Sequence, residues 1–409
     1  MPAPLRFAVV PAALLVLAPA ARAGFANEYA VFGNRSLTFQ GFANVAGGPA
    51  GSNGDVNHLG GSGYFDSLRG GGSLNPSPPT AWTGRQNVTG DVVFNNDVNI
   101  NQLSTVNGSV HAGGSANVAT VLGGVTANGP VSVSIYNNIG GITSGGNVTL
   151  STGVNVAGNV GANGDVAAGL SVTIGGTVTL TGNYTQGSFS SNGGVVNGSV
   201  NPQPKTYTPV TLPPATVFTS GGQNVTLNTF NDVTLAPGKY GALSLAGSTD
   251  LHLTGGNYYF DSIASTGTFF DLHLDLTHGP VNLFVTGDVD FKRIRPIVNG
   301  GDYKLVDPAL AGNVYLESHG NINMTGEFFG ALYAPTGDVV TGTIGAVTGS
   351  IVAGRDAIIG SATSIDDGST TYVASSYMAA AVAAVPEPTG VFSLGVAGLV
   401  ALAGRRRRQ

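Results

Sequence analysis

Three polar residues alternate with leucines in one short segment of the second half of the chain. Asp271, His273 and Asp275 are separated by single leucines. In a strand, residues two apart share a face and lie roughly 7 Å from each other, so this face would present an acid, an imidazole and a second acid. His252 also stands between two leucines and could lie on a neighbouring coil.

Carboxylate oxygens and imidazole nitrogens are ligands for divalent ions. His252, Asp271, His273 and Asp275 are therefore a candidate ligand face. The plainer interpretation, which we favour, is that they form the solvated face of an amphipathic strand, because nothing in the sequence fixes their mutual geometry. We assign no metal and no cofactor to them.

The interior of the chain has one cationic cluster, Lys292, Arg293 and Arg295, placed just before Pro296. It could contact an acidic polysaccharide, although a charge run is more commonly a solvated loop. The remaining histidines have no nucleophile partner that sequence can identify, and no acid pair has a spacing typical of glycoside hydrolysis. We predict no catalytic residue. A β-helical polysaccharide lyase or hydrolase is the alternative function.

The elements that carry these residues are expected to be strands. Charged residues make up only 9% of the chain, whereas glycine accounts for 64 of 409 residues. Short segments have apolar residues two apart, which is the strand period. Four segments resemble one another: 107–114, 163–169, 197–200 and 349–354. Each reads as a short strand closed by a glycine turn, where glycine supplies the positive φ of a tight bend.

Such short strands bury little apolar surface alone, so we predict a right-handed parallel β-helix in which successive coils stack Val and Ile into one column. Each inward Val or Ile would contribute roughly 1.5 to 3 kcal/mol. An antiparallel β-sandwich is the alternative, because short strands with glycine turns fit both folds.

Charge excludes one class of partner. Of the 16 Lys and Arg residues, six lie in the two terminal segments discussed below, which leaves 10 against 22 acids, a net charge of −12 for residues 24–388. A surface of this sign repels phosphate backbones, so we predict no nucleic-acid binding. The chain has no cysteine, so disulfides and thiolate metal sites are absent.

Prolines divide the mature chain. Pro202, Pro204, Pro209, Pro213 and Pro214 cannot occupy a central sheet, so residues 201–214 are expected to form an extended connector or a surface strap. We predict a Gly/Asn-rich β-solenoid over residues 24–200 and a β-helix domain over residues 215–373. An alanine-rich linker, residues 374–384, follows.

The first 23 residues have the pattern of a secretory signal peptide. Arg6 precedes an apolar stretch at residues 7–17, and Ala21 and Ala23 form a small-x-small cleavage site. Cleavage by signal peptidase would leave Gly24 as the first mature residue.

The last 25 residues, 385–409, have three parts in a fixed order. A short motif, Val385, Pro386, Glu387 and Pro388, precedes an uncharged segment at residues 389–404, which is followed by four arginines, Arg405, Arg406, Arg407 and Arg408. The uncharged segment is somewhat short of the roughly 20 residues that span a membrane as a helix. The arginines would stay on the cytoplasmic side, leaving the motif on the outer side. An ordinary single-span anchor would explain the last two parts but not the motif.

This tail resembles the PEP-CTERM sorting signal of exported Gram-negative proteins, which the membrane enzyme exosortase recognises. The resemblance implies cleavage near the motif, transient association with the inner membrane and a link to exopolysaccharide and biofilm. Residues 235–240, 258–260, 287–289, 329–335 and 349–353 are similar to an uncharacterised bacterial surface β-helix domain, and the Asn-Gly repeats resemble bactofilin-like β-helices. We therefore expect a non-enzymatic structural or adhesive protein of the envelope or extracellular matrix.

Overall fold

The computed structural model describes residues 29–76, 85–266, 269–360 and 363–366. These residues form an all-β parallel solenoid with 43 strands and three short 3-10 helices. Among the described strands only β35 and β36 pair in antiparallel fashion. The predicted parallel β-solenoid is confirmed and the sandwich alternative is wrong. The predicted signal peptide with its Ala21, Ala23 and Gly24 cleavage site, the linker, the sorting tail and its hydrophobic helix lie outside the described residues.

Each coil contributes strands to three faces. Face 1 consists, in spatial order, of β28 (Gly238–Lys239), β31 (Gly256–Phe260), β34 (Val281–Val285), β37 (Val314–Ser318), β39 (Ala331–Ala334), β41 (Ile351–Ala353), β1 (Val31–Gly33), β4 (Ala50–Ser52), β7 (Leu68–Gly70), β10 (Val92–Phe94), β13 (Val110–Ala112), the second parts of β15 (Thr120–Ala127) and β17 (Asn138–Ser144), β20 (Val160–Ala162), β23 (Val178–Leu180) and β25 (Val195–Asn197).

In chain order, the strand that comes after each face 1 strand belongs to face 2. It consists of β26 (Val225–Leu227), β29 (Ala242–Leu245), β32 (Ser262–Ser265), the first parts of β35 (Val289–Val298), β38 (Ile322–Phe329) and β40 (Val339–Thr348), β42 (Asp356–Ile359), β2 (Ser36–Phe39), β5 (Asp55–His58), β8 (Leu74–Pro76), β11 (Val98–Asn99), β14 (Ala116–Val118), β16 (Val131–Val133), β18 (Val148–Leu150), β21 (Val166–Ala168) and β24 (Tyr184–Gln186).

Face 3 completes each coil. It consists of β27 (Asp232–Leu235), β30 (Ser248–Thr254), β33 (Phe269–Asp275), the second parts of β35, β38 and β40, β43 (Thr363–Asp366), β3 (Ala43–Ala46), β6 (Gly63–Phe65), β9 (Gln86–Val88), β12 (Thr105–Val106), the first parts of β15 and β17, β19 (Asn155–Val156) and β22 (Thr173–Ile174). Outside the three faces lie β36 (Gly301–Asp302), η1 (Leu276–His278), η2 (Tyr303–Leu305) and η3 (Pro308–Asn313).

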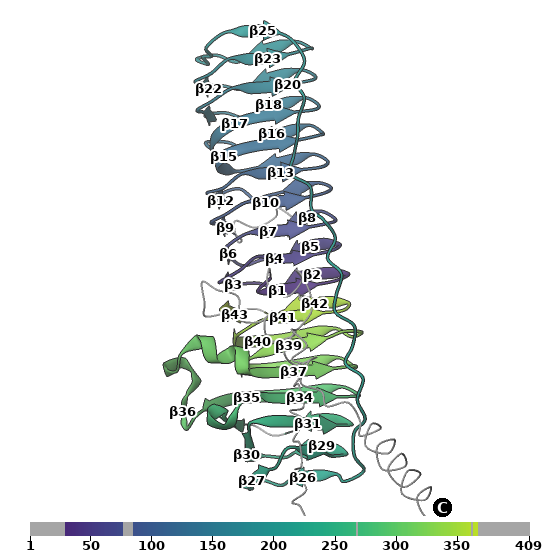
Figure 1. Ribbon diagram of the computed structural model, residues 1–409. Helices are drawn as coiled ribbons and strands as arrows, with labels where there is room; N and C mark the ends of the chain where they lie inside the picture. Colours follow the sequence, from purple (N-terminus) through teal and green to yellow (C-terminus); the bar gives the residue numbers. More distant parts are fainter. Residues whose placement is uncertain (1–28, 77–84, 267–268, 361–362, 367–409) are drawn as a thin grey trace, which may run out of the picture. The chain divides into compact units, whose positions relative to one another are not determined.

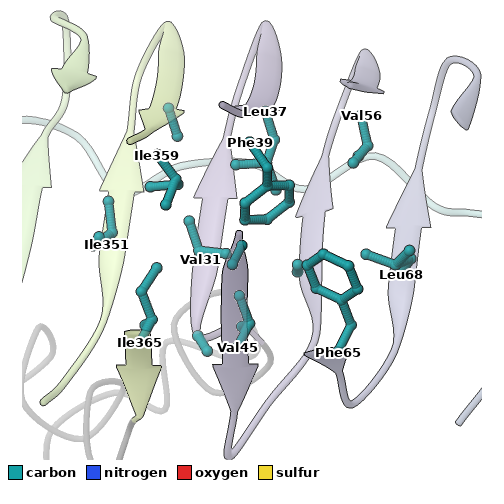
Figure 2. Close-up of a cluster of buried hydrophobic side chains, with 14 of the residues drawn as sticks. Val31, Leu37, Phe39, Val45, Val56, Phe65, Leu68, Ile351, Ile359 and Ile365 are labelled. Carbon is teal, nitrogen blue, oxygen red and sulfur yellow. The ribbon is translucent and has the colours of Figure 1, made fainter. Parts of the chain in front are cut away.

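The chain enters this solenoid in the middle. Its first strand, β1, pairs with β4 on one side and with β41, near the end of the described chain, on the other. Coils therefore run from β1 to one end at β25, and a second series runs from β26 back to β43, where it meets the first (Figure 1). Figure 2 shows this junction, where Val31 and Phe39 lie close to Ile351 and Ile359 inside the coils. The first and second halves share one continuous hydrophobic core.

Glycines at the coil corners allow neighbouring coils to stack closely. A Cβ atom on Gly113 would lie 2.0 Å from the carbonyl oxygen of Asn95, and one on Gly354 would lie 1.9 Å from that of Pro335. Neither glycine has a positive φ. In these two copies of the repeated segment, glycine is needed because a side chain would collide with the next coil, not because of the bend geometry we expected. At these two glycines the expectation was wrong, whereas Gly349, in the same segment as Gly354, has the positive φ that we expected, at 134°.

An extended segment, residues 198–224, carries the chain between the two ends of the solenoid. It contains no strand and runs along the coils as a teal trace in Figure 1. Three asparagine side chains of face 1 coils hold it, each accepting from one backbone N–H and donating to the C=O of the same residue. The pairs are Asn163 with Val200, Asn95 with Tyr207 and Asn53 with Val210, at 2.7 to 2.9 Å. We call this segment the strap.

The strap is also held at its second end. Thr216 donates its N–H and its hydroxyl to the carboxylate of Glu317, at 2.6 and 2.7 Å. Glu317 is fully buried and also accepts from Tyr315 Oη at 2.9 Å. Phe218 packs against Phe284, with ring centroids 5.4 Å apart. A buried carboxylate needs several donors to be tolerated, and these contacts supply them. The strap thus covers face 1 and leaves faces 2 and 3 as the outward sheet surfaces.

Candidate functional site

The candidate ligand residues lie on face 3 of the second half, where strand register stacks them into columns. Asp232 pairs with Asp250, Asp250 with Asp271, and Asp271 with Arg295. All four side chains point outward, since each is more exposed than the residues that flank it in its strand. The column brings three carboxylates and one guanidinium to successive rungs, which are roughly 4.8 Å apart.

A second column, two residues further along each strand, holds the two histidines. His252 pairs with His273, and their rings stack with centroids 4.0 Å apart and planes inclined by 17°. Each Nε2 faces a carboxylate one rung below: His252 lies 2.9 Å from Asp232, and His273 lies 3.1 Å from Asp250. The strand register therefore places His252 on the coil next to Asp271 and His273, as predicted.

The carboxylate of Asp271 does not face a histidine but the guanidinium of Arg295. The pair is two-pronged, with Arg295 Nε 3.0 Å from Asp271 Oδ1 and Nη2 bonded to Oδ2. This geometry raises the pKa of Arg295 above its ordinary value, chiefly through the hydrogen bond to Asp271. Arg295 itself is more than half exposed, so the pair contributes little to stability.

Asp275, the fourth predicted residue, does not join the columns. Its side chain turns to the N-terminus of η1, where it accepts from the Thr277 N–H at 3.0 Å and approaches His278 Nδ1 at 3.1 Å. The Thr277 hydrogen bonds lower the pKa of Asp275. Asp275 is therefore a capping residue.

Asp250, Asp271 and His273 form a set that could hold a metal ion, since one ligand atom from each lies within 4.8 Å of the others. Each of these residues already has a partner within the protein, however. A cation would have to displace the guanidinium of Arg295 from Asp271 and the imidazole from Asp250. The arrangement is a network of ion pairs on the protein surface, in which the strand register fixes a mutual geometry that the sequence did not reveal.

Beside the columns, face 3 is hollowed into an open groove of about 980 Å³. It is lined by Phe230, Ser248, Thr249, Asp250, Phe269, Asp271, Arg293, Ile294, Arg295, Thr325, Gly326 and Glu327. The groove lies where β35 and β38 change register, between Phe291 and Ile294 and between Met324 and Gly326. Bulges of this kind are common beside binding sites because they redirect side chains.

Two phenylalanine rings border the groove. Phe230 is 85% exposed and Phe269 is 59% exposed. The guanidinium of Arg293 lies 5.7 Å from the ring centroid of Phe269, within cation–π range. Phe230 and Arg293 have φ of 66° and 52°, in the left-handed region that non-glycine residues seldom occupy.

The structure separates the members of the cationic cluster. Arg295 pairs with Asp271, Lys292 lies 3.4 Å from Asp290, and the guanidinium of Arg293 lies beside the Phe269 ring, which stays 59% exposed. Between β35 and β37 the chain leaves the coil in an excursion, residues 299–313, which contains η2 and η3 and projects beside β35 in Figure 1 (green). Its Lys304 is a further cation, with Nζ 2.5 Å from Glu327 Oε1.

Sequence reasoning missed several residues of this site: Asp232, Asp250, Phe230, Phe269 and Glu327. The acids at 232 and 250 carry a usable signal, because each stands two residues before a Thr or His in an alternating segment. No sequence signal marks Phe230 and Phe269, because their position at the groove depends on the register of three coils. The buried Glu317, with His319 at 3.1 Å, was also missed.

Comparisons with known proteins add little to this description. No family model matches the chain, and no curated protein matches it. A solved structure, the crystal structure of an ice binding protein from an Antarctic bacterium Flavobacteriaceae, is 14% identical over 83% of this chain and 96% of that chain, with a TM-score of 0.23. This likeness assigns no function. Within the described residues, no helix has the length and apolar character needed to span a bilayer.

Proposed function

We propose that the protein is a non-enzymatic structural or adhesive component of the bacterial envelope or extracellular matrix, associated with exopolysaccharide. Its signal peptide would direct export through signal peptidase. The Pro-Glu-Pro motif and the arginines of the tail would direct processing by exosortase at the inner membrane. We further propose a right-handed winding of the coils, the usual sense of parallel β connections.

The observation that carries the proposal is the repetition of short polar side chains on the two faces that the strap leaves uncovered. On face 2 the outward column reads Thr38, Asn57, Asn75, Asn99, Asn117, Ser132 and Thr149 in consecutive register. Face 3 has a similar column of Asn87, Thr105, Thr120, Asn138, Asn155 and Thr173. Such ladders offer donors and acceptors at every rung, which suits contact with sugar hydroxyls or with another regular surface.

A carbohydrate-active enzyme is the second candidate, favoured by Asp250 and Asp271 in the groove. Glycoside hydrolysis requires one carboxylic acid that donates a proton, which is usually kept in an apolar pocket. Both aspartates are instead partly exposed, and each faces a nitrogen donor. This geometry supports binding more than it supports proton transfer.

Cell fractionation tests the proposal. We expect the full chain in the envelope or matrix fraction and a chain lacking residues 386–408 in a different fraction. The purified protein is expected to release no sugar and no unsaturated product from polysaccharides. Turnover that disappears in Asp271→Ala would instead establish the enzyme, and unchanged fractionation of the truncated chain would contradict the sorting role of the tail.

A further inference from the structure

The groove on face 3 has the chemistry of a glycan site. Phe230 donates its N–H to the carbonyl oxygen of Ser248 at 2.6 Å, and Ser248 is paired with Phe269. The three residues therefore occupy one position on consecutive coils, and two rungs, roughly 9.5 Å, separate the two phenylalanines along the solenoid. This spacing is close to that of alternate rings in an extended polysaccharide.

Exposure of both rings is unfavourable in a protein without a ligand. A phenylalanine left in water forgoes the favourable free energy of burying its apolar ring. Phe230 additionally holds a left-handed backbone, with φ of 66°. The same backbone and exposure recur at Phe189, at the corresponding turn of another coil, so they belong to the turn. What distinguishes the groove is that two exposed rings border it beside polar side chains, an apolar surface that a ligand would cover.

The polar lining is balanced in charge. Asp271 pairs with Arg295, Asp250 faces His273, and Glu327 pairs with Lys304. Three acids and two arginines line the groove itself. A polyanion would gain little net attraction here and would be repelled by the negative charge of the mature chain. Paired carboxylates and guanidiniums nevertheless keep free lone pairs and N–H groups that can bind hydroxyls.

We propose that this groove binds a neutral polysaccharide, with sugar rings stacked on Phe230 and Phe269 and hydroxyls bound by Asp250, Asp271 and Arg295. The inference rests on the proposed association with polysaccharide and names the class of ligand and the site. Aromatic faces contact the apolar C–H faces of the sugar, and the few polar groups fix its orientation.

The first half of the chain provides a matched control. Phe189 is 89% exposed and has φ of 59°. It stands two residues before Ser191, the face 3 position bridged to Thr173, as Phe230 stands two residues before Asp232. Its neighbours on face 3 are Thr173 and Ser191 rather than ion pairs. Phe189→Ala therefore removes an exposed, strained phenylalanine without changing the groove.

Affinity electrophoresis of the full chain in mild detergent tests the inference. The probes are the neutral polymers hydroxyethyl cellulose, dextran and galactomannan and the acidic polymer alginate, each at low and high salt. We expect retardation by at least one neutral polymer, independent of salt. The double variant F230A/F269A should bind it about tenfold more weakly or not at all, whereas F189A should bind as the wild type does.

Three results would overturn the inference: wild type that no neutral polymer retards, F230A/F269A that binds normally, or binding confined to alginate and abolished by salt. Because both rings are exposed, F230A/F269A should keep the wild-type unfolding temperature, and F269A alone provides a milder variant. A groove that fails this test while tail-dependent fractionation persists would leave the surface role intact. Fractionation that does not depend on the tail, together with normal glycan binding, would contradict the sorting role of the tail and leave the binding role of the groove intact.

Discussion

The coils of residues 95–200 and the coils of residues 225–330 pair their strands in the same parallel manner but fill their interiors differently. In the first stretch the buried apolar side chains are Val, Ala, Ile and Leu, with no aromatic among them. In the second, fully buried rings such as Phe260, Phe270 and Phe291 belong to the core, and Phe270 stacks on Phe291. The small side chains belong to regular coils, and the large ones to coils of variable length.

Coil length separates the two stretches. Side chains that bond to the next coil in the first stretch reach residues mostly 18 positions away, as Asn147 and Asn159 do. In the second stretch the separation is 25 for Asn257 and Asn282, and 33 for Asp288 and Asn321, because excursions leave the coil. Uniform coils give uniform neutral columns on face 3, whereas irregular coils give bulges, a groove and ion pairs. The comparison indicates that irregularity of the solenoid, not its repeats, produces the groove and its ion pairs.

The largest expected effect is on core packing. Phe270→Ala should lower the free energy of unfolding by about 3 to 5 kcal/mol, since it removes a fully buried ring beneath the groove that stacks on Phe291. Val160→Ala, at an equally buried position of the first stretch, should cost about 2 kcal/mol. Urea unfolding of both variants measures the difference. Equal losses would show that the larger buried rings of the second stretch contribute no more to stability than the valines of the first.

Substitution of corner glycines should lower stability by an intermediate amount, which should be the same in both halves. Gly113→Ala and Gly354→Ala each place a Cβ within about 2 Å of a carbonyl oxygen of the adjacent coil, so we expect losses of about 1 to 3 kcal/mol. Gly222→Ala is the matched control, because its Cβ would meet no atom within 4 Å. Thermal unfolding provides the measurement. A loss in only one half would mean that the two halves do not share one corner geometry.

The sequence predicts more of the fold than of the site. The period-two valines and the repeated Asn-Gly segments predicted parallel coils, because each coil repeats the same local pattern. The pairing of β1 with β41 had no local signal, since it joins residues 320 positions apart. For the site, alternation placed Asp271 and His273 on one face. It could not show that Asp275 caps η1, or that Arg295 lies beside Asp271, because both depend on where coils of unequal length bend.

The smallest expected effect is on pH dependence, and it concerns a buried histidine of the first half. His58 is buried between Phe39 and Phe65, and its Nε2–H donates to the Gly41 carbonyl at 3.1 Å. Burial lowers the pKa of His58 in the folded protein, an effect that outweighs this hydrogen bond. The unfolded chain, with a pKa of about 6.5, therefore binds the proton first as pH falls.

Stability linked to His58 should thus be constant at neutral pH and should decline as pH falls below about 6.5 toward the lower pKa of the folded state. His58→Gln keeps a donor for Gly41 but cannot titrate, so its unfolding temperature should fall less between pH 7 and pH 5 than that of the wild type. If H58Q and the wild type have the same slope, acid sensitivity does not originate in the buried histidine of the first half.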